Sequence, residues 1–257
     1  MAEPATSGQT TIQPPPVTQP SAPPPTRPVL VNNALLDSGY VGAQGGTERR
    51  GICGGGSVMV GVSFYFYGVG AGDRLGFLAP VCARFGDDPF APLQWARDDA
   101  ADFWPQTDVL AGDPPPPFPA QLLSELVCPP PLVLAGAQGN MDPDLVNSTY
   151  IIRDIVLECS PVYEVPGSSQ VVIDRASSSF YATSALPFSG TEQYSLGCDN
   201  GNVAAGLFES SGSWVDGFAL SCTSVTRPRI AGDACFSGDA CQSGVCDGSG
   251  TCAATAQ

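Results

Sequence analysis

The sequence predicts an all-β protein whose main domain is built from three hairpin-based internal repeats. Two observations lead to this fold class. The 257 residues include 30 Gly and 26 Pro, about twice the usual share of these residues, which favours many short strands joined by turns over long helices. In addition, one pattern recurs three times along the chain: two cysteines bracket an apolar strand that contains a glycine, a turn and a second strand.

The charged residues exclude several classes of function. The chain has 10 Arg, no Lys, no His and 25 Asp plus Glu, which gives a formal net charge of −15. The lack of His and Lys rules out a Ser-His-Asp triad, a Schiff base, a P-loop lysine and an imidazole metal site. Such an acidic chain is also unsuited to nucleic acid or to an anionic membrane surface, and it has no apolar run long enough for membrane insertion. We therefore expect a protein that is not an enzyme and has no cofactor and no metal.

The cysteines indicate an oxidising compartment. Their number, 10, is even, and no C-x-x-C pair suggests a metal site, so disulfides are expected. We predict an extracellular or cell-surface location. Residues 1–28 lack the basic start and apolar stretch of a signal peptide, so we expect either that a signal was removed and a Met restored, or that the export route is not written in this chain. The Lys-free composition, rich in Ala, Gly, Pro and Asp, is typical of a high-GC bacterium.

Composition divides the chain into three parts: a disordered Pro/Thr-rich tether, the repeat domain and a Cys-rich tail, at residues 1–28, 29–228 and 229–257. The three copies of the repeat lie near residues 40–83, 120–162 and 185–226. An acidic insert, 84–127, separates the first two copies. We expect it to be a solvated loop over one end of the sheets, with a short helix over Pro92–Trp104.

Each repeat predicts one disulfide, because its two cysteines bracket a hairpin and can staple the outer ends. The predicted bridges are Cys53–Cys82, Cys128–Cys159 and Cys198–Cys222. Pairing outside the repeats stays open, since spacing does not fix connectivity. The tail contains Cys235, Cys241, Cys246 and Cys252, which can form two bridges in three possible ways.

Two short motifs resemble the jacalin-related β-prism lectins. Gly212-Ser213-Trp214-Val215-Asp216 in the third copy is similar to their G-x-x-x-D hairpin, and Gly45-Gly46 resembles their N-terminal glycine-rich loop. The resemblance implies a prism of three Greek keys with pseudo-threefold symmetry, for which a barrel-like packing is the alternative. The other copies depart from the motif, because Val69 and Tyr150 stand where it requires glycine. The Cys-bracketed repeats are similar to those of secreted bacterial proteins, and the tail resembles Dickkopf-like cysteine-rich tails.

The resemblance also implies a sugar site where the two loops meet. In it the Asp216 carboxylate would accept hydrogen bonds from paired sugar hydroxyls. Backbone amides of the turn would donate hydrogen bonds, and the Trp214 ring would cover the apolar side of the sugar. In the purely structural interpretation Gly212 permits the turn, Asp216 caps it and Trp214 packs in the core. The candidate carbohydrate-binding residues are Gly46, Gly212, Ser213, Trp214 and Asp216.

The leading prediction is therefore a secreted or surface protein that binds a glycan without catalysis. The alternative is a structural or adhesive protein that binds other surface proteins or itself, for which aromatic residues in Phe64–Tyr67 that face outward would provide a surface. Weaker alternatives are Ca²⁺ binding, glycoside hydrolysis by two carboxylates, and glycosylation at the sequon Asn147-Ser148-Thr149. The candidate Ca²⁺ ligands are Asp142, Asp144 and Asn147, or Asp98, Asp99 and Asp102.

Overall fold

The computed structural model is all-β, as predicted. It describes residues 30–31, 36–43, 47–54, 56–67, 74–86, 94–98, 124–144, 149–165, 168–182, 192–199, 201–211 and 215–254. Among these residues the helical segments are the short 3-10 turns η2 (Arg175–Ser177) and η3 (Gly238–Ala240). In this described part no helix has the length and apolar character needed to cross a membrane. The predicted tether, residues 1–28, lies outside the described residues.

The short helix predicted within Pro92–Trp104 is wrong over its described part. Trp95–Arg97 form strand β7, because they pair with the edge of a neighbouring strand, where Ala83 lies opposite Arg97. The half-buried Trp95 ring fixes this position, since its indole N–H donates to the Leu132 carbonyl at 2.7 Å.

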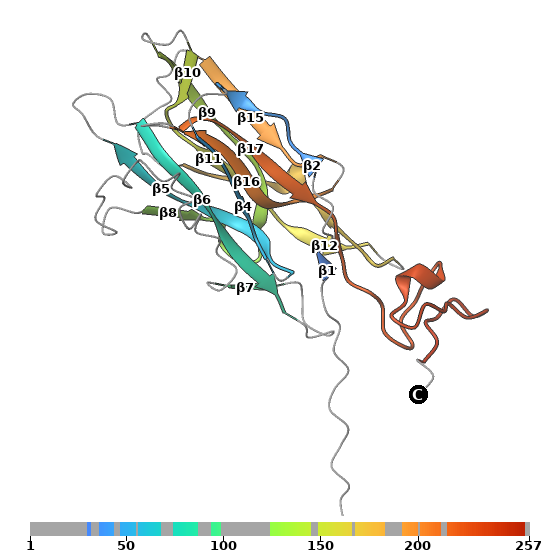
Figure 1. Cartoon of the computed structure of the whole chain (residues 1–257). Coiled ribbons are helices and arrows are strands. Elements are labelled where there is room, and N and C mark those ends of the chain that lie inside the picture. Colours follow the sequence, from blue (N-terminus) through green and yellow to red (C-terminus); the bar gives the residue numbers. More distant parts are fainter. Residues whose placement is uncertain are drawn as a thin grey trace, which may run out of the picture.

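Three main sheets enclose the core (Figure 1). Sheet I has the order β8-β5-β6-β7. Besides β7, its strands have the bounds β5 (Val58–Tyr67), β6 (Arg74–Phe85) and β8 (Ser124–Val127). In sheet II, β9 pairs with β10, β11 and β15, and β14 pairs with β11; the bounds are β9 (Val133–Asp144), β10 (Thr149–Ile152), β11 (Val156–Ser160), β14 (Ser179–Ala182) and β15 (Glu192–Gly197). Sheet III has the order β4-β16-β17, with β2 and β3 on the far side of β17; the bounds are β2 (Leu36–Asp37), β3 (Val41–Gly42), β4 (Thr47–Ile52), β16 (Val203–Ser211) and β17 (Val215–Thr223).

The sheets do not coincide with the sequence repeats, because one strand of every repeat joins the preceding sheet. Strand β8 precedes Cys128 of the second copy but pairs with β5 of sheet I. Strand β15 precedes Cys198 of the third copy but pairs with β9 of sheet II. Strand β4 precedes Cys53 of the first copy and pairs with β16 of sheet III. The three repeats therefore interlock in a ring, and the pairing of β4 with β16 closes the ring between the first and last repeats.

The three sheets pack as a β-prism. Their central strands β5, β9 and β16 contact one another pairwise. One core cluster contains buried side chains from all three sheets, among them Leu78, Leu134, Leu157, Leu207 and Phe218. Each sheet turns one face toward this shared core, which is how alternating strands bury their apolar residues.

The three predicted disulfides of the repeats are confirmed, and they connect different sheets. Cys53–Cys82 joins the end of β4 in sheet III to β6 in sheet I. In the same way Cys128–Cys159 joins sheet I to sheet II, and Cys198–Cys222 joins sheet II to sheet III. The bridges thus lie at the three junctions of the ring, and each one fixes a sheet to its neighbour rather than only closing a hairpin.

A bulge and a glycine recur at each junction. The backbone N–H groups of Cys53, Cys128 and Cys198 donate to the carbonyls of Ala205, Val60 and Ala135 at 2.8–2.9 Å, and each of these carbonyls belongs to the extra residue of a β-bulge. The residues that follow are glycines, where an added Cβ would lie 2.2–2.6 Å from a backbone oxygen of the neighbouring strand: Gly61, Gly136 and Gly206. The repeated glycine is therefore required by the close approach of two backbones.

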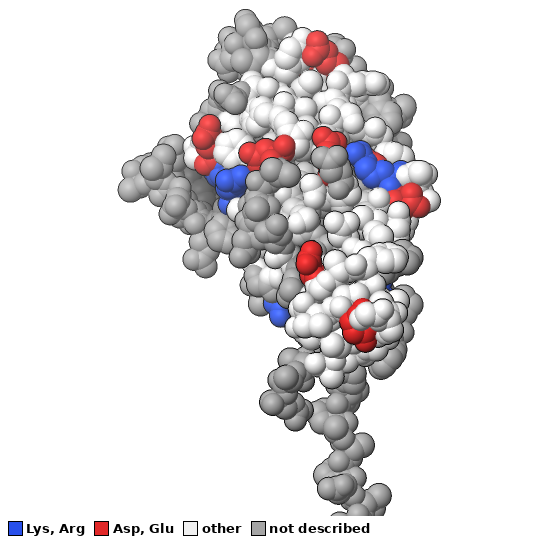
Figure 2. Space-filling model, turned by 90° about the vertical axis from the view of Figure 1, so that its right-hand side faces the viewer, with Lys and Arg blue, Asp and Glu red and all other residues white. Residues whose placement is uncertain are grey.

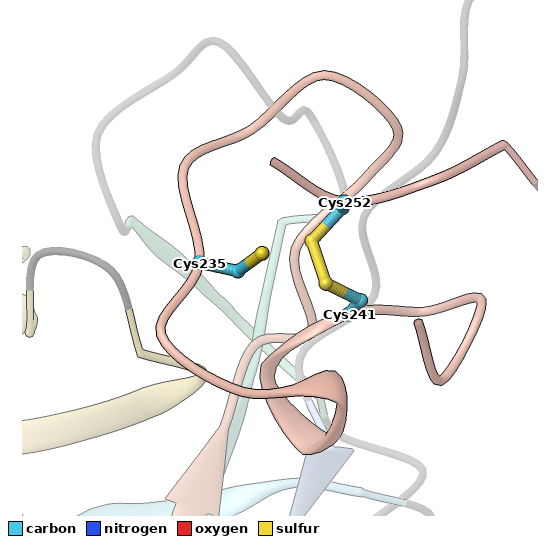
Figure 3. A group of neighbouring side chains, drawn as sticks. All are labelled: Cys235, Cys241 and Cys252. Atoms are coloured by element: carbon cyan, nitrogen blue, oxygen red, sulfur yellow. A yellow bond between two sulfur atoms is a disulfide. The ribbon is translucent and has the colours of Figure 1, made fainter. Parts of the chain in front are cut away.

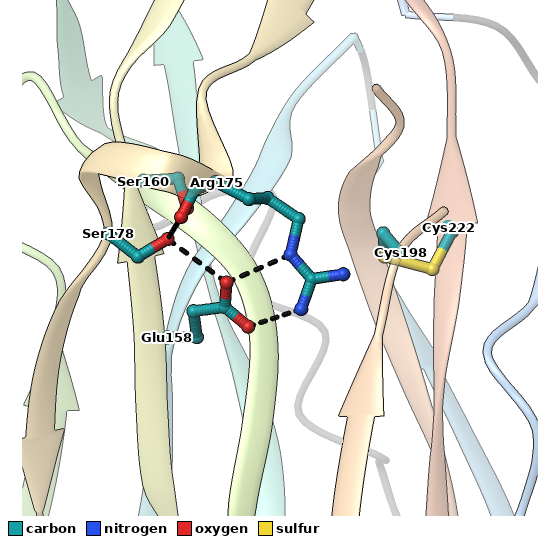
Figure 4. A network of polar contacts seen from close by, with 6 residues as sticks. All are labelled: Glu158, Ser160, Arg175, Ser178, Cys198 and Cys222. Carbon is teal, nitrogen blue, oxygen red and sulfur yellow. Dashed lines mark hydrogen bonds and ion pairs between the residues drawn. A yellow bond between two sulfur atoms is a disulfide. The ribbon is translucent and has the colours of Figure 1, made fainter. Parts of the chain in front are cut away.

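The junction between sheets II and III is polar, unlike the other two. The residue before the first cysteine is Ile52 or Val127 at the other junctions but Gly197 here, and the guanidinium of Arg175 occupies the space beside it. Arg175 donates through Nε to Glu158 at 2.8 Å and pairs with it again through Nη2. Ser178 also donates to Glu158, at 3.0 Å, next to the Cys198–Cys222 bridge (Figure 4).

A small fourth sheet leads into the tail. Its order is β1-β18-β13-β12, with bounds β1 (Leu30–Val31), β12 (Val162–Glu164), β13 (Gln170–Ile173) and β18 (Val225–Thr226). The buried Arg227 pairs with Glu164 at 2.8 Å. Arg229 donates to the carbonyls of Ser168 and Val165 at 2.9 and 3.0 Å, so two arginines attach the tail to this sheet.

The tail contains two disulfides, Cys235–Cys246 and Cys241–Cys252, which selects one of the three pairings left open by the sequence. Its buried cluster consists of Ala240 and the cysteines. The bridges therefore supply most of its core, as expected for so short a segment.

Candidate functional site

Of the five residues predicted to bind sugar, the structure describes Asp216, which lies in β17 at one end of sheet III. Gly46, Gly212, Ser213 and Trp214 lie outside the described residues. What the structure gives is the position of the residues that flank the two predicted loops. These are Ala43 and Thr47 around segment 44–46, and Ser211 and Val215 around segment 212–214.

The flanks of the two segments meet. Ser211 lies opposite both Thr47 and Val215 in the ladder, and the Ala43 N–H donates to the Asp216 carbonyl at 2.9 Å. Because β3 pairs with β17 and β4 pairs with β16, the two ends of segment 44–46 stand on opposite sides of the β16–β17 hairpin. Residues about 170 positions apart in the chain are thereby brought to one sheet end.

Asp216 occupies a β-bulge. Ser211 pairs with Val215 and Ser210 pairs with Gly217, which leaves Asp216 as the extra residue between them. Its side chain is half-buried. A bulge at a strand end re-aims a side chain out of the regular ladder, so the position of Asp216 is fixed by the pairing on both sides of it.

Gly42 is required beside Asp216, and the sequence analysis did not identify it. Its φ is +84°, a conformation that favours glycine. A Cβ on Gly42 would lie 2.2 Å from the Asp216 carbonyl oxygen. Strand β3 can approach β17 this closely only because Gly42 has no side chain.

Tyr40 lies over Gly217, the residue next to Asp216. Its hydroxyl donates to the Ala43 carbonyl at 2.8 Å, and its ring packs edge-on against Phe208 with a centroid distance of 6.0 Å. Burial raises the pKa of Tyr40, a hydrogen bond with Ser210 lowers it, and the negative charges of Asp216, Glu48 and Glu209 raise it further. The site end of sheet III is therefore acidic, and Tyr40 remains a protonated donor at neutral pH.

The buried carboxylate of Glu209 connects this end of sheet III to sheet I. Glu209 on β16 is 1% exposed and accepts the Leu78 N–H of sheet I at 3.0 Å. It also pairs with Arg49 of β4 at 3.5 Å. Glu209 thus connects the sheet that carries Asp216 to the neighbouring sheet, which holds the site end in place.

The aspartate of the second copy has a structural role. Asp154 accepts the Asn140 backbone N–H at 2.9 Å and the Asn140 side-chain amide at 3.0 Å. Its carbonyl accepts the hydroxyl of the buried Tyr194 at 2.7 Å. Because these contacts are internal to sheet II, this copy does not offer its aspartate to a ligand in the way proposed for Asp216.

The predicted aromatic surface of the first repeat is not formed by Phe64, which is 4% exposed and packs in the shared core. The side chains of residues 65–67 lie outside the described part. The exposed large apolar side chains among the described residues are instead Tyr150, Tyr163, Phe180, Phe236 and Val245.

The candidate Ca²⁺ ligands that the structure describes are engaged with arginines. Asp98 pairs with Arg84 at 3.0 Å and accepts the Ser57 hydroxyl at 3.0 Å, and Asp142 pairs with Arg153 at 3.2 Å. Asp99, Asp102, Asn147 and the side chain of Asp144 lie outside the described residues, as does Ser148 of the sequon. On the face in Figure 2 the acidic side chains are spread out, and Arg side chains lie beside some of them.

One group of potential metal ligands occurs among the described residues, and it consists of Cys235, Cys241 and Cys252 (Figure 3). Their sulfurs lie within 4.8 Å of one another because two disulfides stack in the tail. A sulfur in a disulfide is not a thiolate and does not bind a metal as one.

The sequence matches no protein-family model and no curated protein. Similar solved structures are Frutapin, a lectin from Artocarpus incisa (13% identity, 75% of this chain, 99% of that chain, TM-score 0.43), and a mannose-specific jacalin-related lectin from Morus nigra in complex with mannose (14%, 75%, 96%, 0.40). Single-chain recombinant jacalin is a third (14%, 75%, 96%, 0.41). All three TM-scores lie below 0.5, so the assignment of a β-prism rests on the strand pairing described above.

Proposed function

We propose that this protein is a non-catalytic carbohydrate-binding protein that acts outside the cell, with its site at the end of sheet III. The single observation that carries the proposal is the convergence of the flanks of segments 44–46 and 212–214 at Asp216. The proposed binding residues are Gly46, Gly212, Ser213, Trp214 and Asp216. The five disulfides support an oxidising, extracellular location.

The chemistry of the site suits a sugar. A fixed carboxylate accepts hydrogen bonds from two neighbouring hydroxyls, and charge-assisted bonds of this kind are about twice as strong as neutral ones. Backbone N–H groups of the two segments supply donors, and the Trp214 ring supplies an apolar surface for the C–H side of the sugar. The acidic surroundings of Tyr40 favour neutral hydroxyl ligands over anionic ones.

A glycan array with the disulfide-intact protein tests the function, and Asp216→Asn tests the site. Mannose is the first sugar to include, since the Morus nigra lectin is in complex with it. Asp239→Asn is the matched control, because it makes the same change at an exposed position in the tail. We expect binding by the wild type and the control, and its loss in Asp216→Asn. Binding that survives Asp216→Asn refutes the site, and an array without any signal refutes the function.

A second candidate function is assembly with other protein chains, and the tail provides its surface. Phe236 and Val245 are 85% and 52% exposed, and each is the chain neighbour of one cysteine of the Cys235–Cys246 bridge. The bridge therefore holds two exposed apolar residues near one another in the tail, where they could contribute to a contact surface. If this function holds, sedimentation velocity of the wild type will show self-association that Phe236→Ser removes; a monomer at all concentrations contradicts self-assembly.

A further inference from the structure

We propose that Tyr40 is a positioning residue of the sugar site: its hydroxyl fixes Ala43, the residue from which segment 44–46 begins, against Asp216. The consequence for sugar binding rests on the proposed function. The positioning itself rests on contacts among described residues and is testable without a ligand.

Both peptide groups of Ala43 form hydrogen bonds, one with the Tyr40 side chain and the other with the Asp216 backbone. The Ala43 carbonyl accepts the Tyr40 hydroxyl at 2.8 Å, and the Ala43 N–H donates to the Asp216 carbonyl at 2.9 Å. A residue whose N–H and C=O are both bonded has little freedom to rotate either peptide plane. Tyr40 on one side and Asp216 on the other therefore fix the orientation of Ala43.

Tyr40 is itself held in place by sheet III. Its ring contacts Phe208 edge-on, and it lies over Gly217, where an added Cβ would come 2.6 Å from the Tyr40 hydroxyl oxygen and 2.7 Å from Cε1. Gly217 follows Asp216 in the chain and pairs with Gly42 in the ladder. Because Gly217 has no side chain, the Tyr40 ring can lie directly over it.

The hydroxyl is the part of Tyr40 that a phenylalanine would not replace. Phe at this position keeps the packing against Phe208 but leaves the Ala43 carbonyl without its donor and removes the hydrogen bond with Ser210. The bond from the Ala43 N–H to the Asp216 carbonyl would remain. Tyr40 thus acts on the ligand through Ala43 and does not need to touch it.

The test is Tyr40→Phe, with Tyr163→Phe as the matched control, since Tyr163 lies on the small fourth sheet and is 51% exposed. Two quantities are measured: the dissociation constant for the best sugar of the array, and the hydrogen-exchange rate of the Ala43 amide. We expect Tyr40→Phe to weaken sugar binding about three- to tenfold, the range of one lost hydrogen bond, and to speed exchange at Ala43. Tyr163→Phe should change neither.

The two readouts separate failure of the proposal from failure of the proposed function. If the wild type binds no sugar, the function fails, and the Ala43 exchange rate still decides the positioning role. Unchanged exchange at Ala43 in Tyr40→Phe overturns the proposal. Faster exchange spread evenly over β16 and β17 also overturns it, because that result indicates a general loss of stability in sheet III.

Discussion

The Cys198–Cys222 bridge tests whether the disulfides lock the ring of sheets. The perturbation is the double variant Cys198→Ala/Cys222→Ala, which removes the covalent link between sheets II and III. The bridge closes a loop with a sequence separation of 24, for which the chain-entropy model gives about 3.5 kcal/mol. Both cysteines are buried, so the small cavities left by the sulfurs add about 1 kcal/mol. We expect the free energy of unfolding to fall by about 4.5 kcal/mol.

Urea-induced unfolding followed by near-ultraviolet circular dichroism measures this loss. The control is Cys235→Ala/Cys246→Ala. This bridge has a sequence separation of 11, and the same model gives it a stabilisation of about 2.8 kcal/mol. That bridge lies in the tail, so its removal should leave the unfolding midpoint of the prism unchanged. A loss under about 1 kcal/mol for the first variant, or equal losses for both variants, would refute the reasoning that the bridges act at the sheet junctions.

Three further predictions follow from the junctions and the buried polar groups. Gly206→Ala should lower the free energy of unfolding by about 3 kcal/mol, because the new Cβ would lie 2.2 Å from the Gly51 carbonyl oxygen. Gly248→Ala should change it little, because no atom lies within 4 Å of the new Cβ. Urea titration of both variants measures the difference. Burial raises the pKa of Glu158, but hydrogen bonds from Arg175 and Ser178 outweigh it, so the pKa is lowered from 4.5. The stability that this pair contributes is present above pH 4.5 and is lost as the pH falls through the lowered value, so Glu158→Gln should flatten the pH dependence of the unfolding midpoint below pH 4.5. Tyr194→Phe removes the buried hydroxyl that donates to the Asp154 carbonyl at 2.7 Å; it should cost about 1–2 kcal/mol in thermal unfolding without any change in sugar affinity, and a loss of affinity would show that sheet II contributes to the site.

The sequence predicts the fold class and the disulfides of the repeats better than it predicts which strands share a sheet. The all-β class and the three bridges follow from a pattern of cysteines and apolar strands that is visible locally. The exchange of strands between sheets is not visible, because an edge strand has the same alternation whichever sheet it joins. A local signal does mark the three equivalent junctions: Cys53, Cys128 and Cys198 are each followed by Val five positions later and by Gly eight positions later.

The candidate site shows a similar limit. Asp216 belongs to a motif that a reader of the sequence can find, but Tyr40 and Gly42 do not. Their importance comes from contacts with the Asp216 carbonyl and with Gly217, which are far away in the chain. A tyrosine before a short strand and a glycine within it carry no local sign of such contacts.

The placement of the site in sheet III follows from how the ring closes. Sheets I and II are each built from one continuous stretch of the chain, β5 to β8 and β9 to β15, whereas sheet III combines β2, β3 and β4 with the C-terminal hairpin β16–β17. Only in sheet III, among the three main sheets, do segments from both parts of the chain meet at one sheet end. The proposed site therefore requires a closed ring, because Ala43 reaches Asp216 through the pairing of β3 with β17. Closure depends in turn on the three junctions, so the bridges and glycines that stabilise the prism also hold the two halves of the proposed sugar site together.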